Sequence, residues 1–149
     1  MSFVRVFPDP EAMAWEIAHQ WYYGALEASQ KKNLFTVVLS GGATALQVYL
    51  KIGSPQWNDK MPWEVIHIFW ADERCVPPED EESNYFNLQR ALLEDLPIPT
   101  ENIHRICGES EPSVESARYE KDILDHLAFR NDKQKLFDWV LLGVGLDGH

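Results

Sequence analysis

Predicted strands and helices alternate along this chain, and the alternation restricts the fold more than any other feature of the sequence. Apolar runs at 34–39, 65–71 and 137–142 predict buried strands, and helical periodicity fills much of the sequence between them. No Asn-Gly or Asp-Gly hairpin signal joins two strands. Strands separated by helices pair in parallel, so we expect an α/β fold with a doubly wound, mostly parallel, Rossmann-like sheet and helices on both faces.

Several local patterns define the other expected elements of a single domain over 1–149. Residues Phe3–Phe7 favour a first strand, and a helix is expected from Pro10 with Asp9 as its N-cap. A short strand is expected within 102–107, and the proline-containing segment 54–63 is expected to be a loop. The predicted helices carry apolar faces at Met13, Ile17, Trp21 and Ala25; at Leu46, Tyr49 and Leu50; at Leu88, Leu92 and Leu96; and at Ala117, Ile123, Leu124 and Leu127.

Composition and charge exclude several classes of function. The chain is 45% hydrophobic and 25% charged, as in globular proteins, and its net charge of −11 argues against nucleic acid or an anionic membrane as a partner. Cys75 and Cys107 are too few for a disulfide framework, which favours reduced thiols. The sequence contains neither a signal peptide nor an apolar run long enough to span a membrane, so we expect a cytoplasmic protein.

The first polar cluster, Ser40-Gly41-Gly42-Ala43-Thr44, links a predicted strand to a predicted helix. Glycines let a ligand approach the backbone, N–H groups at a helix start favour an anion, and Ser40 and Thr44 add hydroxyl donors. No Gly-Lys-Ser/Thr follows, so the stretch is not a Walker loop. An ordinary tight turn is the alternative.

Two further clusters follow predicted strands. In Asp72-Glu73-Arg74, Arg74 suits a phosphate or carboxylate and Asp72 a substrate hydroxyl, although an ion pair that fixes the loop is the alternative. After the last strand, Asp147 and His149 suit a general base that is oriented by a carboxylate. A turn that contains an aspartate and a histidine without a function is the alternative. The stretch 143–148 matches G-x-G-x-x-G, but we reject a dinucleotide site because that fingerprint follows the first strand. Carboxyl ends of parallel strands share one edge, so the three clusters are expected to converge.

The remaining histidines give weaker signals. His19, His67, His104 and His126 show no metal-ligand spacing, and core, cap or surface roles are expected for them. The sequence therefore predicts no metal site.

Jointly, the three clusters, together with Val76-Pro77 and Glu82-Ser83-Asn84, resemble the 6-phosphogluconolactonases over almost the whole chain. The resemblance implies hydrolysis of 6-phosphogluconolactone in the pentose phosphate pathway, without metal or organic cofactor. His149 would activate the attacking water and Asp147 would hold the imidazole or the substrate. The phosphate and sugar would be bound by Ser40, Gly41, Gly42, Thr44, Asp72 and Arg74.

The chain departs from the family pattern in two places. The loop continues as Ala43-Thr44-Ala45 where the family has Ser/Thr-Thr-Pro, which predicts weaker phosphate binding. Family members continue beyond the Asp-Gly-His stretch, so we expect an N-terminal fragment whose domain is incomplete on its C-terminal side. Three alternatives stay open: a glucosamine-6-phosphate deaminase, which usually has Asp-Glu-Tyr at 72–74; a non-catalytic sugar-phosphate-binding module; and a fragment that folds only with its remainder. The sequence does not predict the oligomeric state.

Overall fold

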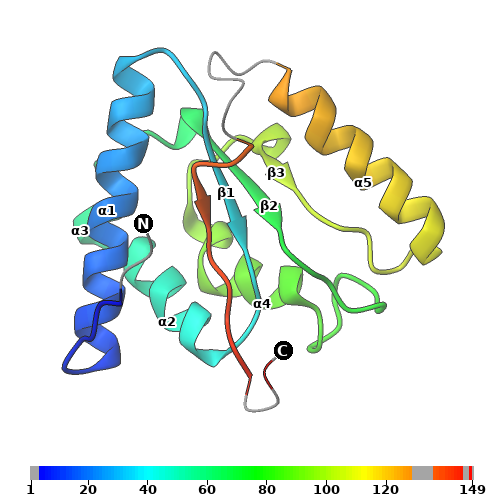
Figure 1. Cartoon of the computed structure of the whole chain (residues 1–149), viewed down its shortest axis with the longest axis horizontal. Helices are drawn as coiled ribbons and strands as arrows, with labels where there is room; N and C mark the ends of the chain where they lie inside the picture. The colour runs from blue at the N-terminus through cyan, green and yellow to red at the C-terminus, as the bar shows by residue number, and fades with distance from the viewer. Residues whose placement is uncertain (1–3, 129–135, 146–147, 149) are drawn as a thin grey trace.

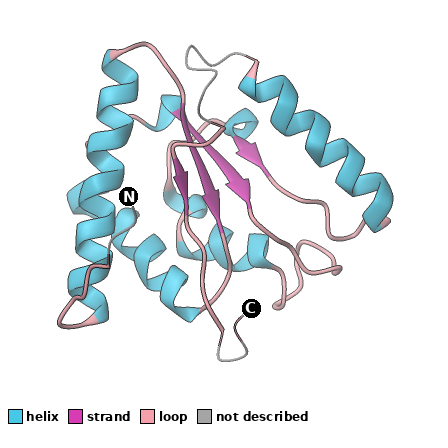
Figure 2. Cartoon of the chain, viewed as in Figure 1, coloured by secondary structure: helices cyan, strands magenta, loops and turns pink. Residues whose placement is uncertain are grey.

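A parallel sheet forms the centre of the molecule. The computed structural model describes residues 4–128, 136–145 and 148. Within these residues the sheet has four strands, in the order β3-β2-β1-β4. They are β1 (Phe35–Leu39), β2 (Ile66–Trp70), β3 (Ile103–His104) and β4 (Trp139–Val140). Every neighbouring pair is parallel, with Val37 opposite both Ile68 and Trp139 (Figure 2). The predicted α/β class and parallel sheet are confirmed.

Helices cover both faces of the sheet. They are α1 (Pro10–Gln30), α2 (Ala43–Ile52), α3 (Pro55–Asn58), α4 (Asn84–Ala91) and α5 (Pro112–Leu127). Short 3₁₀ turns lie at Trp63–Val65, Leu93–Asp95 and Thr100–Asn102. Figure 1 shows α1, in blue, and α5, in yellow to orange, on opposite sides of the strands. Within the described residues, no helix is both long and apolar enough to cross a membrane.

The hydrophobic core lies between one sheet face and helices α1, α2 and α4. Side chains alternate between the two faces of a strand, and every residue of β1 and β2 is buried. The core face carries Phe35, Val37, Leu39, Ile66, Ile68 and Trp70, which pack with Trp21, Tyr49 and Leu88. Burial on both faces explains why these strands are apolar almost throughout.

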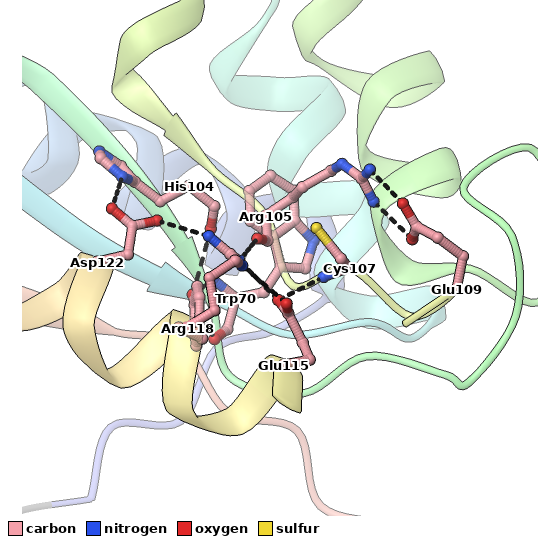
Figure 3. A network of polar contacts seen from close by, with 9 residues as sticks. Trp70, His104, Arg105, Cys107, Glu109, Glu115, Arg118 and Asp122 are labelled. Carbon is pink, nitrogen blue, oxygen red and sulfur yellow. Dashed lines mark hydrogen bonds and ion pairs between the residues drawn. The ribbon is translucent and has the colours of Figure 1, made fainter. Parts of the chain in front are cut away.

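Helix α5 packs on the other face through polar and aromatic contacts. Its Tyr119 hydroxyl accepts from Trp70 N at 2.8 Å and lies 3.2 Å from the His104 carbonyl oxygen. Buried Glu115 accepts from Cys107 N at 2.7 Å and from Arg118 Nη2 at 2.6 Å (Figure 3). The hydrogen bonds and charge of Arg118 lower the pKa of Glu115 below its ordinary value of 4.5.

The first helix begins as predicted, whereas the strand predicted before it is wrong. Asp9 Oδ1 accepts from Ala12 N at 2.7 Å, and Pro10 occupies the first helical position. Residues 4–7 form no strand, and Val4 and Val6 are each 89% exposed. Alternating β-branched residues favour an extended backbone, but a strand also needs a neighbour that accepts its hydrogen bonds and buries its side chains.

Three other predictions need correction. The expected loop 54–63 contains α3. The buried side chain of Trp57 anchors this helix to the core. Helix α4 ends at Ala91 rather than extending through Leu96, because Leu92 adopts φ −140° and leaves the helical region. On α5 the predicted apolar face is largely wrong, since Leu124 is 59% exposed and the buried positions include a glutamate and a histidine.

Candidate active site

The order in which strands are added to the sheet reverses at β1. The chain passes from β1 to β2 and β3 on one side, and then returns to β4 on the other side of β1. In parallel sheets of this kind, ligands bind outside the carboxyl ends of the strands where the order reverses. The segments that follow β1, β2 and β4 are those that carry the three predicted clusters. In Figure 1 the described parts of these segments lie at the same edge of the sheet.

The loop after β1 leaves polar groups available at the start of α2. Gly42 is the N-cap of α2 with φ 110°, a conformation that favours glycine, and no side chain caps the helix. Gly42 and Thr44 are exposed, so the first N–H groups of the helix face an accessible region. The Ser40 hydroxyl is buried and has no hydrogen-bond partner among the described residues, while Ser40 O accepts from the buried Tyr49 hydroxyl at 2.6 Å. This loop can donate hydrogen bonds to an anion.

Asn84, the first residue of α4, joins the loops that follow β1 and β2. Its Nδ2 donates to both Asp72 O and Asp72 Oδ2, each at 3.1 Å. On its other side, a Cβ built on Gly41 would lie 2.0 Å from Asn84 Oδ1, so only glycine fits there without displacing the amide. The structure therefore brings Gly41 and Asp72 together through the buried side chain of Asn84, which the sequence analysis named only within the Glu82-Ser83-Asn84 motif.

Glu73 fixes the loop after β2 to the start of α4. Its Oε1 accepts from Asn84 N at 2.7 Å, and its Oε2 accepts from Tyr85 N at 2.8 Å and Ser83 Oγ at 3.1 Å. Ser83 Oγ in turn accepts from Phe86 N at 3.1 Å, so Ser83 is the N-cap of α4. A carboxylate at a helix N-terminus satisfies N–H groups that have no partner within the helix and opposes the positive end of its dipole.

Arg74 is exposed and forms no ion pair within the described part of the chain. The ion pair considered as an alternative for this cluster is therefore not observed. The Arg74 backbone N–H donates to Glu73 Oε1 at 2.7 Å. A Cβ on Gly108 would lie 2.1 Å from Arg74 O, so the backbone of the segment after β3 packs directly against this loop. The backbone is held while the guanidinium stays accessible to an anion.

The turn after β4 is described only in part. Leu141 N donates to Val38 O at 2.9 Å, which extends the pairing of this segment with β1 past the end of β4. Gly148 has φ 83°, and its N–H donates to Gly145 O at 3.0 Å. The predicted catalytic residues Asp147 and His149 lie outside the described residues.

A cavity of about 590 Å³ opens between the loop after β2 and helix α5. Its volume lies within the range of small-molecule sites. Its lining includes Asp72, Glu73, Cys75, Cys107, Tyr119 and Leu124. Of the predicted site residues that the structure describes, only Asp72 lines this cavity, so the glycine loop is not part of its wall.

One histidine cluster was missed by the sequence analysis. Among the described residues, His67, His104 and His126 place ring nitrogens within 4.8 Å of one another, on the α5 face of the sheet. No spacing along the sequence reveals this group, because its members come from β2, β3 and α5. The available signal was two histidines in strands that a parallel sheet makes neighbours.

The fold and the polar edge of the sheet define a doubly wound α/β protein with a candidate anion-binding crevice at its switch point. The chain belongs to the family of glucosamine-6-phosphate isomerases/6-phosphogluconolactonase, whose sequence pattern matches residues 8–149.

Curated relatives and solved structures agree with this assignment. The chain is 38% identical over 121 residues to a 6-phosphogluconolactonase of Haemophilus influenzae, covering 81% of this chain and 50% of the relative. It is 36% identical over 149 residues to one of Aggregatibacter actinomycetemcomitans, covering 100% of this chain and 60% of the relative. The crystal structure of 6-phosphogluconolactonase from Thermotoga maritima matches with a TM-score of 0.80 at 29% identity, over 97% of this chain and 61% of that one. The chain thus spans 50% and 60% of the two curated relatives.

Proposed function

We propose that the protein carrying this chain hydrolyses 6-phosphogluconolactone to 6-phosphogluconate, as a lactone hydrolase of the pentose phosphate pathway. The observation that carries the proposal is the junction of Gly41, Asn84 and Asp72, which lies next to the uncapped start of α2 in a chain that is 38% identical to a 6-phosphogluconolactonase. The junction holds Gly41 and Asp72 at one sheet edge, which supports phosphate binding by the loop and binding of a sugar hydroxyl by the carboxylate.

The loop after β1 would bind the phosphate. The N–H groups at the start of α2 and the hydroxyls of Ser40 and Thr44 are donors, and the helix dipole favours the negative charge. Arg74 would add a charge-assisted pair of hydrogen bonds to the phosphate or the ring, since its guanidinium is exposed. Asp72 would accept from a sugar hydroxyl, with its carboxylate held by the Asn84 amide.

The chemical step would take place at the turn after β4. His149 would remove a proton from water as the water oxygen attacks the lactone carbonyl, with Asp147 orienting the imidazole or the substrate. The ring C–O bond then breaks, and the ring oxygen leaves as a hydroxyl after taking a proton. A positioned base contributes typically about 10²–10⁴-fold to such a reaction. Backbone N–H groups of the turn would stabilise the oxyanion. The proposed reaction needs neither a metal nor an organic cofactor at this site.

Rates on two substrates separate this proposal from its closest alternative. The protein should accelerate the disappearance of fresh 6-phosphogluconolactone above its spontaneous rate, and it should release no ammonium from glucosamine 6-phosphate. The His149→Ala variant should lose the acceleration, and His19→Ala, on α1, is the matched control. Ammonium release would replace the lactonase by a deaminase. Binding of 6-phosphogluconate that survives His149→Ala, without turnover of either substrate, would indicate a non-catalytic module. The cytoplasmic location stays a prediction.

A further inference from the structure

Three buried histidines meet between the sheet and α5, away from the candidate active site. His67 is the second residue of β2, His104 is the last residue of β3, and His126 lies near the end of α5. Each side chain is only 9% exposed. The ring centroids of His67 and His126 are 4.0 Å apart, and those of His104 and His126 are 4.7 Å apart. Three separate elements therefore place their imidazoles in one small volume.

Hydrogen bonds fix how the His104 ring presents its nitrogens. His104 Nδ1 lies 3.0 Å from Asp122 Oδ1, and His104 Nε2 lies 3.1 Å from His67 Nδ1. The carboxylate acceptor keeps the proton on His104 Nδ1, so the lone pair of Nε2 points into the cluster. Arg118 Nη1 lies 3.4 Å from the other oxygen of Asp122 and holds this carboxylate in place, as Figure 3 shows.

We propose that His67, His104 and His126 form a binding site for a divalent transition-metal ion of the Zn²⁺ kind, with Asp122 as the residue that orients His104. His104 would bind through Nε2 and His67 through Nδ1, and His126 would supply one ring nitrogen. Three imidazole nitrogens suit Zn²⁺, whereas Mg²⁺ and Ca²⁺ require oxygen ligands. The carboxylate–histidine–metal arrangement is the one by which proteins orient metal-ligating histidines.

The distances fit such an ion. Zn–N bonds of about 2.0–2.1 Å in a tetrahedron separate ligand nitrogens by roughly 3.3–3.4 Å. The His67–His104 nitrogen pair already lies at 3.1 Å, and all three ligand nitrogens lie within 4.8 Å. Small rotations of the side chains would bring the His126 ring nitrogen to the same separation from the other two nitrogens.

This site would be structural rather than catalytic. His67 precedes Asp72 by five residues, about 16 Å of extended chain, so the ion would lie far from the proposed phosphate loop. An ion held by β2, β3 and α5 would add a further link between α5 and the sheet face that it contacts through polar and aromatic groups. The inference is independent of the lactonase proposal, because it concerns other residues and a different ligand.

The test is a Zn²⁺ titration of the metal-stripped protein in competition with a chromophoric chelator, on a Cys75→Ser/Cys107→Ser background that removes thiol ligands. We expect one equivalent to bind and the thermal unfolding midpoint to rise. His104→Ala and His126→Gln should abolish the stoichiometric binding. Asp122→Asn should bind with 10–100-fold lower affinity, as loss of such an orienting partner does. His19→Asn, on α1, is the matched control and should bind like the parent.

A second measurement keeps the test informative if a histidine variant fails to fold. Co²⁺ should give the visible absorption of a tetrahedral, nitrogen-ligated ion in the parent and a weaker spectrum in Asp122→Asn, whose substitution leaves the buried cluster itself intact. A folded parent that binds no stoichiometric Zn²⁺ would overturn the proposal. Binding that is equal in the parent, Asp122→Asn and His104→Ala would also overturn it, because the ion would then lie elsewhere.

Discussion

Glu73 is predicted to hold the loop after β2, and Glu73→Ala tests this directly. Its carboxylate accepts four hydrogen bonds, from the backbone N–H groups of Arg74, Asn84 and Tyr85 and from Ser83 Oγ. A net value of about 1 kcal/mol for each bond gives about 4 kcal/mol as an upper figure. Water can replace part of this at a half-exposed side chain, so we expect a loss of about 2–3 kcal/mol in the free energy of unfolding.

Urea unfolding followed by tryptophan fluorescence measures this loss, because the sequence contains 6 tryptophans. Glu73→Gln should fall between Glu73→Ala and the parent, since its amide keeps one acceptor oxygen. Glu82→Ala is the matched control: Glu82 lies exposed in the same loop, and its change should stay within about 0.5 kcal/mol. Equal stabilities for Glu73→Ala and Glu82→Ala would refute the claim that this carboxylate anchors the loop.

Two further substitutions test the junction and the α5 network. Gly41→Ala places a Cβ 2.0 Å from Asn84 Oδ1 and should lower the free energy of unfolding by about 1–3 kcal/mol in urea titrations. At Gly143, where no atom of the described residues lies within 4 Å of a built Cβ, the same change should be nearly neutral. Because Arg118 lowers the pKa of Glu115 below 4.5, this carboxylate stabilises the fold above about pH 4.5, and the effect is lost as pH falls through the lower folded value. The deficit of Glu115→Gln should therefore be large at pH 7 and shrink below pH 4 in paired urea titrations, and a deficit that does not depend on pH would contradict this assignment.

The sequence correctly predicted the elements whose signal lies within the segment itself. These elements find their hydrogen-bond or packing partner in any arrangement of the fold. Asp9 and Pro10 set the start of α1, and the apolar runs of β1 and β2 require burial on both faces wherever they pair. Residues 4–7 have the same β-forming composition as a real strand, but no strand of the described residues pairs with them. Local patterns specify what a segment can form, while the presence of a partner depends on the whole fold.

For the candidate site, the sequence predicted which strand ends carry polar groups but not how those groups are joined. The parallel order of the strands is enough to place Ser40 and Asp72 at one edge. The path of the chain between β2 and α4 decides how these groups are joined. It lets Asn84 bridge the two loops, and it makes Glu73 a cap of α4 rather than a member of an ion pair. The histidine cluster was missed for the same reason, since it needs the pairing of β2 with β3 and the placement of α5.

Discrimination between phosphorylated and unphosphorylated lactone tests the central claim most directly, namely that these strand ends form a sugar-phosphate site. We would compare kcat/KM for 6-phosphogluconolactone and for gluconolactone, each corrected for spontaneous hydrolysis, in the parent and in Arg74→Ala. We expect a preference of about 10²-fold or more for the phosphorylated lactone, since a site that donates charge-assisted bonds to phosphate rejects a substrate that lacks it. Arg74→Ala should reduce the preference mainly through KM. Equal kcat/KM values for the two lactones in the parent would contradict the account.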